Sequence, residues 1–218
     1  MPAYLPNLLG GIGVTAQIAV LSALVAFLLA SIFGVMRGSA RRSLAILAII
    51  YIEFFRGTSL LVQLFWLYFV LPQFGVSWPP LWVAVIGIGL NYGAYGAEIV
   101  RAALASVAKG QREAAHALGL TGLQCLRLVI VPQALVIFIR PWGNLMIQLL
   151  KATSLVSLIT IADLTYRAYQ LTQLTMQTMQ IMGLVLLIYF VLAQIIAAAV
   201  SFADLRVGTW RRVRAGDG

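Results

Sequence analysis

The stretch KGQREAAHALGLTGLQCLRLVIVP, from Lys109 to Pro132, decides the fold because it is too polar for a lipid bilayer, whereas the segments on both sides are apolar. Its first half has the periodicity of an amphipathic helix with charged residues on one face. The other face is expected to be small and apolar, formed by Ala114, Ala115, Leu118 and Gly119. Gly119 and Gly122 should interrupt this helix. The stretch predicts a helical loop between two membrane spans, a pattern that an ordinary surface helix would also show.

The composition is that of an integral membrane protein. Of the 218 residues, 62% are hydrophobic and 10% are charged, and the mean hydropathy is +0.98. A soluble domain has about 25% charged residues. At roughly 20 residues per span, the length fits one all-α transmembrane domain, residues 1–218, with about five transmembrane helices. The expected spans are about 12–36, 44–71, 81–100, 134–158 and 181–203, with the polar loop at 101–132.

The distribution of basic residues predicts the orientation in the membrane. The net charge of +9 is compatible with nucleic-acid binding, but the hydropathy excludes a soluble nucleic-acid-binding domain. Cytoplasmic loops of membrane proteins are rich in Lys and Arg. With the N-terminus outside and the C-terminus inside, 11 of the 15 basic residues face the cytoplasm, and so does the loop at 101–132. These residues are Arg37, Arg41, Arg42, Arg101, Lys109, Arg112, Arg127, Arg206, Arg211, Arg212 and Arg214.

The sequence offers little for catalysis. Cys125 is the only cysteine and His116 the only histidine, so a disulfide within the chain, a Cys/His metal site and a Ser-His-Asp arrangement are not expected. The sequence lacks a phosphate-binding loop of the form GxxxxGK[ST]. We therefore predict no catalytic residues, no metal ligands and no directly bound cofactor, and a membrane enzyme is disfavoured. If ATP drives the protein, ATP and Mg²⁺ are expected on a partner chain.

Polar residues recur at helical spacing inside three of the expected spans. An ionisable side chain at the centre of a span costs roughly 2.5–3.5 kcal/mol on insertion scales, so such residues are functional candidates. The sets are Glu53, Arg56 and Gln63 in the second span, Asn91, Tyr95 and Glu98 in the third, and Arg140, Asn144, Gln148 and Lys151 in the fourth.

Two roles fit these residues: they line a path for a polar solute, or they hold helices together by hydrogen bonds. Both stay open for each single residue, and for the stripe on the fourth span we favour the path. The candidates for the path are Asn144, Gln148, Lys151 and Ser154, followed by Arg56 and Glu98. Lys151 has a further alternative, because a long side chain near the end of a span can extend to the membrane surface.

The polar loop resembles the EAA loop of type I ATP-binding-cassette (ABC) importer permeases. The resemblance consists of Glu113-Ala114-Ala115, then Gly119, and after nine residues Val129-Ile130-Val131-Pro132. In that family the loop forms cytoplasmic coupling helices that dock into a groove on the ATPase subunit. The resemblance implies that Glu113 anchors the coupling helix and that Ala114, Ala115 and Gly119 permit close docking, with Leu118 on the same surface.

Other segments resemble the polar amino acid permeases of the histidine/glutamine/arginine type. They are Phe55–Phe65 (FRGTSLLVQLF), Gly96–Arg101 (GAEIVR) and Leu149–Ser157 (LLKATSLVS), and the resemblance extends over about residues 10–205. Many relatives have Asp where this chain has Ala152, which weakens a substrate inference from general relatives. The segments Glu53–Ser59 and Asn91–Glu98 look closer to ectoine/hydroxyectoine-type permeases.

The resemblance implies a permease subunit of an ATP-driven importer for polar amino acids or amino-acid-like zwitterions, in the inner (cytoplasmic) membrane of a bacterium. The implied partners are ABC ATPase subunits, a second permease subunit, identical or homologous, and an extracytoplasmic solute-binding protein. Lipid surrounds the spans, and no nucleic acid is involved. The alternative from another class is an ATP-independent channel or carrier for small polar solutes. Copurification with an ATPase discriminates between the two.

Overall fold

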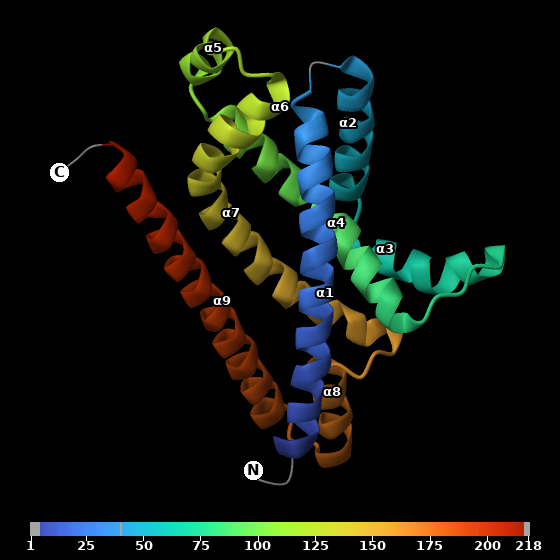
Figure 1. The fold of residues 1–218 in the computed structure, drawn as a ribbon. Helices are drawn as coiled ribbons and strands as arrows, with labels where there is room; N and C mark the ends of the chain where they lie inside the picture. The colour runs from blue at the N-terminus through green and yellow to red at the C-terminus, as the bar shows by residue number, and fades with distance from the viewer. Residues whose placement is uncertain (1–4, 40, 216–218) are drawn as a thin grey trace.

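A computed structural model describes residues 5–39 and 41–215, and the side chains of residues 8–39 and 41–207. Within these residues the regular structure is helical throughout, which confirms the all-α prediction (Figure 1). The elements are α1 (Leu5–Arg37), α2 (Arg42–Gly57), α3 (Leu60–Phe65), η1 (Trp66–Val70), η2 (Leu71–Phe74), α4 (Pro80–Ala105), α5 (Lys109–Ala117), α6 (Gly122–Gln124), η3 (Cys125–Ile130), α7 (Val131–Ala152), η4 (Thr153–Ile159), α8 (Leu164–Thr175) and α9 (Thr178–Ala215).

Four described helices are long and apolar enough to cross a membrane, and a bent pair counts as a fifth span. The four are Leu8–Arg37, Pro80–Ala105, Gly122–Ile159 and Thr178–Val207. They contain the whole of the first, third, fourth and fifth predicted spans. The count of about five spans is thus confirmed when the bent pair is taken as one of them.

The second predicted span, 44–71, is not one straight helix. The chain bends by 98° between α2 and the segment Leu60–Phe74. Thr58 and Ser59 have extended backbone there, so the carbonyl of Phe55 lacks its helical donor. Two side chains replace that donor: Gln63 Nε2 lies 3.1 Å and Asn91 Nδ2 lies 2.9 Å from the Phe55 oxygen. Hydropathy could not reveal the bend because the segment is apolar on both sides of it.

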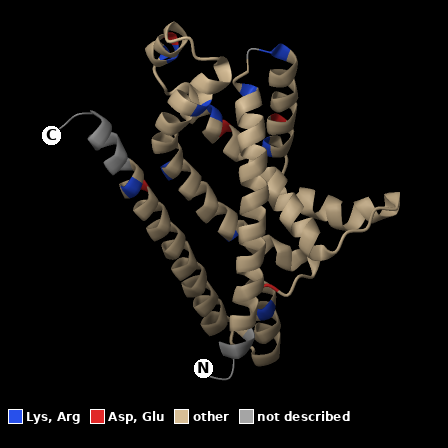
Figure 2. Ribbon diagram, in the orientation of Figure 1, with Lys and Arg blue, Asp and Glu red and all other residues tan. Residues whose placement is uncertain are grey.

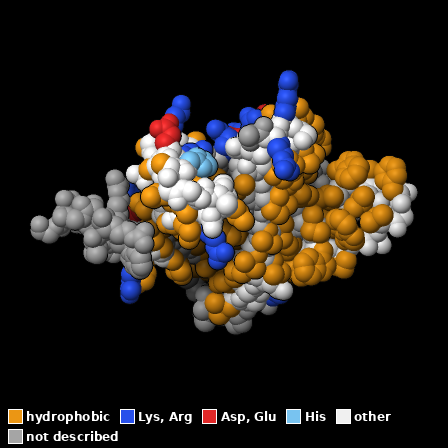
Figure 3. All heavy atoms as spheres, turned by 45° about the horizontal axis from the view of Figure 1, so that its top comes forward, with side chains coloured by type: hydrophobic (Ala, Val, Ile, Leu, Met, Phe, Trp, Pro, Cys, Tyr) orange, Lys and Arg blue, Asp and Glu red, His pale blue; other side chains and the backbone are white. Residues whose placement is uncertain are grey.

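Beyond the bend, the segment Leu60–Phe74 extends sideways from the bundle (Figure 1). It carries no charged residue, and five of its large hydrophobic side chains are exposed, whereas Leu64 is fully buried. Figure 3 shows these hydrophobic side chains as a continuous surface to one side of the molecule. The exposed large residues are Val62, Phe65, Trp66, Phe69 and Phe74. A surface of this kind is expected to face lipid or other apolar partners within the membrane.

Glycines let α4 pack closely along α1. A Cβ atom at Gly89 would lie 2.5 Å from Val25, and one at Gly93 would lie 2.9 Å from Leu29. At Gly96 it would meet Trp142 of α7 at 2.7 Å and Ala30 of α1 at 2.8 Å. Gly96 therefore marks the point where three spans meet at van der Waals distance.

Basic residues gather at one end of the bundle. The C-terminal end of α1, the N-terminal end of α2 and the helix α5 lie together there, whereas the N-terminal end of α1 lies at the opposite end beside α8 (Figure 1). Figure 2 shows most of the blue positions at the end that carries α5. The side chains of Arg211, Arg212 and Arg214, which the topology prediction also used, lie outside the described residues.

Candidate functional site

The loop 101–132 is folded onto the bundle through one face of α5. Ala115 is 3% exposed and packs in a cluster with Cys125, Ile130 and Ala134. The guanidinium of Arg112 donates a hydrogen bond of 2.9 Å to the carbonyl of Leu104, at the end of α4. Burial of the small side chain and the bond to the α4 carbonyl hold α5 against the membrane-spanning part of the chain.

Gly119 ends α5 in a left-handed conformation. Its φ is +75°, its N–H bonds the carbonyl of His116, and the N–H of Leu120 bonds the carbonyl of Ala115. These two bonds form a Schellman cap, which favours glycine because other residues are strained at positive φ. A Cβ at Gly119 would meet nothing within 4 Å. Within this chain the glycine therefore serves helix termination, and its predicted role in close docking stays a prediction.

The predicted apolar face of α5 is split in the structure. Ala115 points into the chain, whereas Ala114, Leu118 and Gly119 are exposed. Leu118 is 81% exposed, and Leu123 of the following turn is 75% exposed. Glu113 is exposed too and forms no ion pair among the described residues. The assignment of all four positions to one helix face was wrong, because α5 ends at Ala117 and the left-handed turn at Gly119 takes Leu118 and Gly119 off that face.

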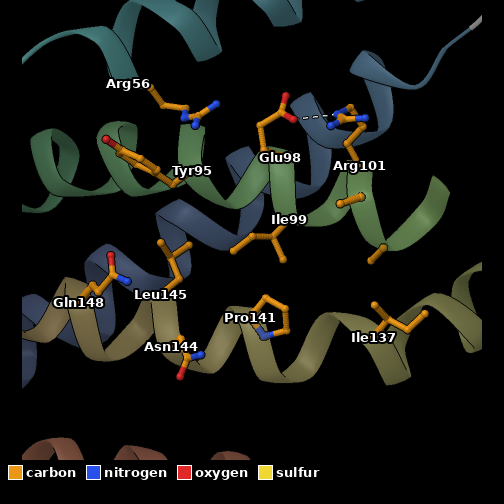
Figure 4. A pocket seen from close by; sticks show the side chains of 12 residues that line it. Arg56, Tyr95, Glu98, Ile99, Arg101, Ile137, Pro141, Asn144, Leu145 and Gln148 are labelled. Atoms are coloured by element: carbon orange, nitrogen blue, oxygen red, sulfur yellow. Dashed lines mark hydrogen bonds and ion pairs between the residues drawn. The ribbon is translucent and has the colours of Figure 1, made fainter. Parts of the chain in front are cut away.

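A pocket of about 470 Å³ lies between α2, α4 and α7 (Figure 4). This volume is in the range of sites for small molecules. It brings together four of the six residues predicted for the solute path. The polar residues that line it are Arg56, Tyr95, Glu98, Arg101, Asn144 and Gln148.

The carboxylate of Glu98 is held by two arginines. Its Oε2 accepts a hydrogen bond of 2.8 Å from Nε of Arg101, and its Oε1 lies 3.5 Å from Nε of Arg37. The sequence analysis missed both partners. The spacing of three residues between Glu98 and Arg101 was a usable signal, since such residues are neighbours on a helix. Arg37 belongs to another helix, and only the packing of α1 on α4 brings it close.

Arg56 enters the pocket from the last turn of α2. Its guanidinium carbon lies 5.2 Å from the centre of the Tyr95 ring, which is cation–π geometry. Glu53, one turn earlier on α2, does not pair with it. Among the described residues Arg56 forms no ion pair. Figure 4 shows the guanidinium between the Tyr95 ring and the carboxylate of Glu98.

The four polar residues predicted to form one stripe on the fourth span do not share one environment in the structure. Asn144 and Gln148 line the pocket, and the hydroxyl of Tyr92 donates to the Gln148 carbonyl at 3.0 Å. Arg140 turns away and pairs with Asp204 of α9 at 2.8 Å. Lys151 and Ser154 do not line the pocket. Lys151 is exposed one turn beyond Gln148, and the Ser154 hydroxyl bonds the Lys151 carbonyl at 2.9 Å. Their place on a solute path stays a prediction.

Asn91 holds helices together. It is 5% exposed, and its amide bonds the Phe55 carbonyl and Oε1 of Gln63. Asn91→Leu should therefore destabilise the folded protein by about 1–2 kcal/mol, since both acceptors lose a buried donor. Thermal unfolding in detergent measures this. Asn144→Leu is the matched control, because Asn144 is exposed and has no hydrogen bond within the described residues. Equal melting of the two variants would contradict the structural role.

The sequence analysis also missed Asp163, which is fully buried at the end of the bundle opposite α5. Its Oδ1 accepts a hydrogen bond of 2.8 Å from the Tyr166 N–H and so caps α8, whereas its Oδ2 has no partner among the described residues. Burial raises the pKa of this carboxyl to about 6. Its hydrogen bonds favour the charged form and lower the pKa, but their effect is smaller than that of burial. No three His, Cys, Asp or Glu side chains gather as a metal site within the described residues.

Comparisons with known proteins agree with this architecture. Residues 26–205 match the family described as binding-protein-dependent transport system inner membrane component. The chain is 42% identical over 70% of its length to the L-cystine transport system permease protein TcyB of Bacillus subtilis, and this match spans 65% of TcyB. It is also 41% identical, over 95% of its length, to a protein of Sinorhizobium fredii named probable amino-acid ABC transporter permease protein y4tF. This match spans 90% of y4tF.

Two solved structures share the fold. A crystal structure of an amino acid ABC transporter with histidines matches with a TM-score of 0.87 and 34% identity, over 94% of this chain and 96% of that one. The methionine transporter MetNI in inward-facing conformations matches with a TM-score of 0.83 and 20% identity, over 95% and 99% of the two chains. The chain therefore belongs to the binding-protein-dependent transport system inner membrane component family, as an ABC importer permease, a transport subunit and not an enzyme.

Proposed function

We propose that this chain is the transmembrane permease subunit of an ATP-driven importer for polar amino acids or amino-acid-like zwitterions. The names of similar proteins support the class of solute, since they include a cystine permease and an amino acid transporter. The pocket between α2, α4 and α7 supports a solute with polar groups, because Arg56, Asn144 and Gln148 present hydrogen-bond donors there. The narrower assignment to ectoine-type permeases stays a prediction.

The proposed assembly has a second permease subunit, two ATPase subunits and an extracytoplasmic solute-binding protein. ATP and Mg²⁺ bind to the ATPase subunits. ATP binding brings the ATPases together, α5 transmits that motion to the spans, and the permeases open outward to receive solute from the binding protein. Hydrolysis resets the inward-open state. This is alternating access, with each state favoured by different contacts at the ATPase interface.

One observation carries the coupling role: the C-cap of α5, Leu118, exposes a large apolar side chain at the basic end of the bundle. Leu118 is 81% exposed and lies between the candidate spans that end at Ala105 and begin at Gly122, so lipid is not expected to cover it. Ala115 and Arg112 meanwhile hold α5 to α4 and α7. A segment that is fixed on its inner side and apolar on its outer side suits the transfer of force from a docked partner.

The basic end is proposed to be cytoplasmic, with the N-terminus outside and the C-terminus inside. Arg37 ends α1, Arg42 begins α2 and Lys109 begins α5, and these helix ends lie at the same end of the bundle (Figure 1). The preference of Lys and Arg for cytoplasmic loops supports this orientation. An ATP-independent channel or carrier, the alternative by sequence, would leave the exposed Leu118 at the end of α5 without a partner.

Leu118→Asp tests the coupling role. We expect the variant to bind its ATPase about ten-fold more weakly or worse, because a charge replaces a central apolar contact. ATP-dependent uptake into proteoliposomes should fall in parallel. Leu174→Asp is the control: Leu174 of α8 is also 81% exposed but lies outside the basic end. Unchanged ATPase binding by Leu118→Asp would contradict the proposal, and so would a wild-type chain that transports without any ATPase.

A further inference from the structure

One backbone carbonyl of α7 loses its helical donor at the wall of the pocket. Pro141 lies inside α7 and has no N–H, so the carbonyl of Ile137, four residues earlier, cannot form its usual helical hydrogen bond. Ile137 and Pro141 both line the pocket, and Figure 4 shows the proline ring on the side of α7 that faces α4. Because the ring stands where the missing hydrogen would lie, the Ile137 oxygen opens on the same side.

Elsewhere in the chain, a carbonyl that has lost its donor is satisfied by side chains. The Phe55 oxygen, at the bend after α2, lies 3.1 Å from Nε2 of Gln63 and 2.9 Å from Nδ2 of Asn91. No side chain within the described residues donates to the Ile137 oxygen in this way. A backbone oxygen is an obligatory acceptor. The donor for Ile137 must therefore come from whatever occupies the pocket, water or solute.

Asn144 adds a second acceptor to the same wall. Ile137, Pro141 and Asn144 follow one another at steps of four and three, so they lie on one face of α7, and all three are exposed and line the pocket. The amide of Asn144 forms no hydrogen bond within the described residues, so its oxygen is free to accept one. Side chains tilt toward the N-terminus of their helix, which directs Asn144 toward the turn that holds the Ile137 carbonyl.

The wall that α2 and α4 form has the opposite chemistry. It presents the guanidinium groups of Arg56 and Arg101, and its one acid, Glu98, accepts a hydrogen bond of 2.8 Å from Arg101. The pocket therefore has cationic donors on one side and neutral oxygens on the other. A zwitterion carries the matching pair of groups, a carboxylate that accepts hydrogen bonds and an ammonium that donates them.

We propose that the α7 wall binds the α-ammonium group of an amino acid through the Ile137 carbonyl and the Asn144 amide oxygen. An ammonium group has three N–H donors and serves both oxygens, whereas an acylated nitrogen has one N–H and no charge. The site recognises a group that α-amino acids share, so it does not discriminate between their side chains. The inference rests on the proposed function as an amino-acid importer and assigns the place of one end of the solute.

The experiment uses the transporter assembled with its own ATPase, in detergent for binding and in proteoliposomes for uptake. The probes are L-glutamine and L-arginine, each paired with its Nα-acetyl derivative, and calorimetric titration gives their Kd values. We expect each acetyl derivative to bind at least about ten-fold more weakly than its parent, because hydrogen bonds to a charged group are lost. Acetylation also adds bulk, so variants of the α7 wall supply the decisive comparison.

Pro141→Ala supplies an N–H that the Ile137 carbonyl accepts within α7, and alanine is favourable inside a helix. We expect this variant to bind both amino acids about ten-fold more weakly and the acetyl derivatives as the wild type does. Asn144→Leu should have the same effect. Pro80→Ala is the matched control, because Pro80 lies in the first turn of α4, outside the pocket lining, where no helical carbonyl loses a donor. It should leave all four Kd values unchanged.

Equal binding of an amino acid and its acetyl derivative overturns the inference, as does binding of neither amino acid. A Pro141→Ala variant that equals the Pro80→Ala control overturns it as well. So does a preference that Pro141→Ala keeps and Glu98→Gln removes, because the ammonium then binds the carboxylate. Uptake separates the two proposals. ATP-driven uptake of amino acids without the preference keeps the transport function and rejects the site, whereas the preference in binding without uptake does the reverse.

Discussion

Gly96→Leu should prevent the transmembrane bundle from packing. A Cβ atom at this position would lie 2.7 Å from the Trp142 ring and 2.8 Å from the Ala30 Cβ, so α1, α4 and α7 would all have to move apart. Leucine adds three more carbon atoms beyond that Cβ. Overpacking a tight core by less than this costs 1–3 kcal/mol, so we expect a loss of at least about 3 kcal/mol.

The measurements are the yield of monodisperse protein in detergent and its thermal unfolding. Gly183→Leu is the matched control, since Gly183 also lies in a membrane-spanning helix but a Cβ there would meet nothing within 4 Å. It should purify and melt like the wild type. If Gly96→Leu melts at the same temperature as Gly183→Leu, the three helices do not meet as closely as the structure has them.

Asp163 should make the folded chain less stable as the pH rises. Its carboxyl lies between the spans that end at Ile159 and begin at Thr178, and burial raises its pKa from 3.8 to about 6. The folded state therefore holds a proton that the unfolded state releases. The stability that this provides is fully present below about pH 4 and is lost as the pH rises through about 6. The loss is about 3 kcal/mol, because each unit of pKa corresponds to about 1.4 kcal/mol.

Asp163→Asn should remove this dependence while keeping the helix cap. An asparagine oxygen can still accept the hydrogen bond from Tyr166 N–H, and asparagine is as good as aspartate at the start of a helix. We expect the variant to melt with the wild type at pH 4 and above it at pH 8, in a detergent series across this range. A wild type that gains relative stability between pH 4 and pH 8, compared with the variant, would refute the assignment.

Sequence reasoning was accurate where the membrane itself imposes the pattern. Every backbone amide must be satisfied in lipid, so long apolar segments become helices, and hydropathy alone locates them. Long polar stretches are excluded from lipid for the same reason, which identified α5. The glycines of the third span, Gly89, Gly93 and Gly96, are sites of close helix approach, and only the structure shows that their partners lie in α1, α2 and α7.

Sequence reasoning failed to predict which partner a polar residue contacts where two partners were possible at different distances along the chain. Asn91 and Asn144 are the same residue type in neighbouring spans, yet Asn91 bonds the broken backbone at Phe55 and Asn144 faces the pocket. Arg140 belongs to the same stripe as Gln148 by spacing but pairs with Asp204. A helical period specifies direction around one helix only. Which helix lies in that direction depends on the packing of the whole bundle.

The sequence by itself determined that this chain is an all-helical membrane protein with a polar loop between spans, because hydropathy and helical period are local properties. Only the tertiary structure decided the bend at Thr58 and Ser59, the split of the α5 face and the approach of Arg37 to Glu98. The physical reason is that a buried polar atom takes whichever partner the packing brings within about 3 Å. Those partners lie on other helices, at sequence separations that no local pattern records.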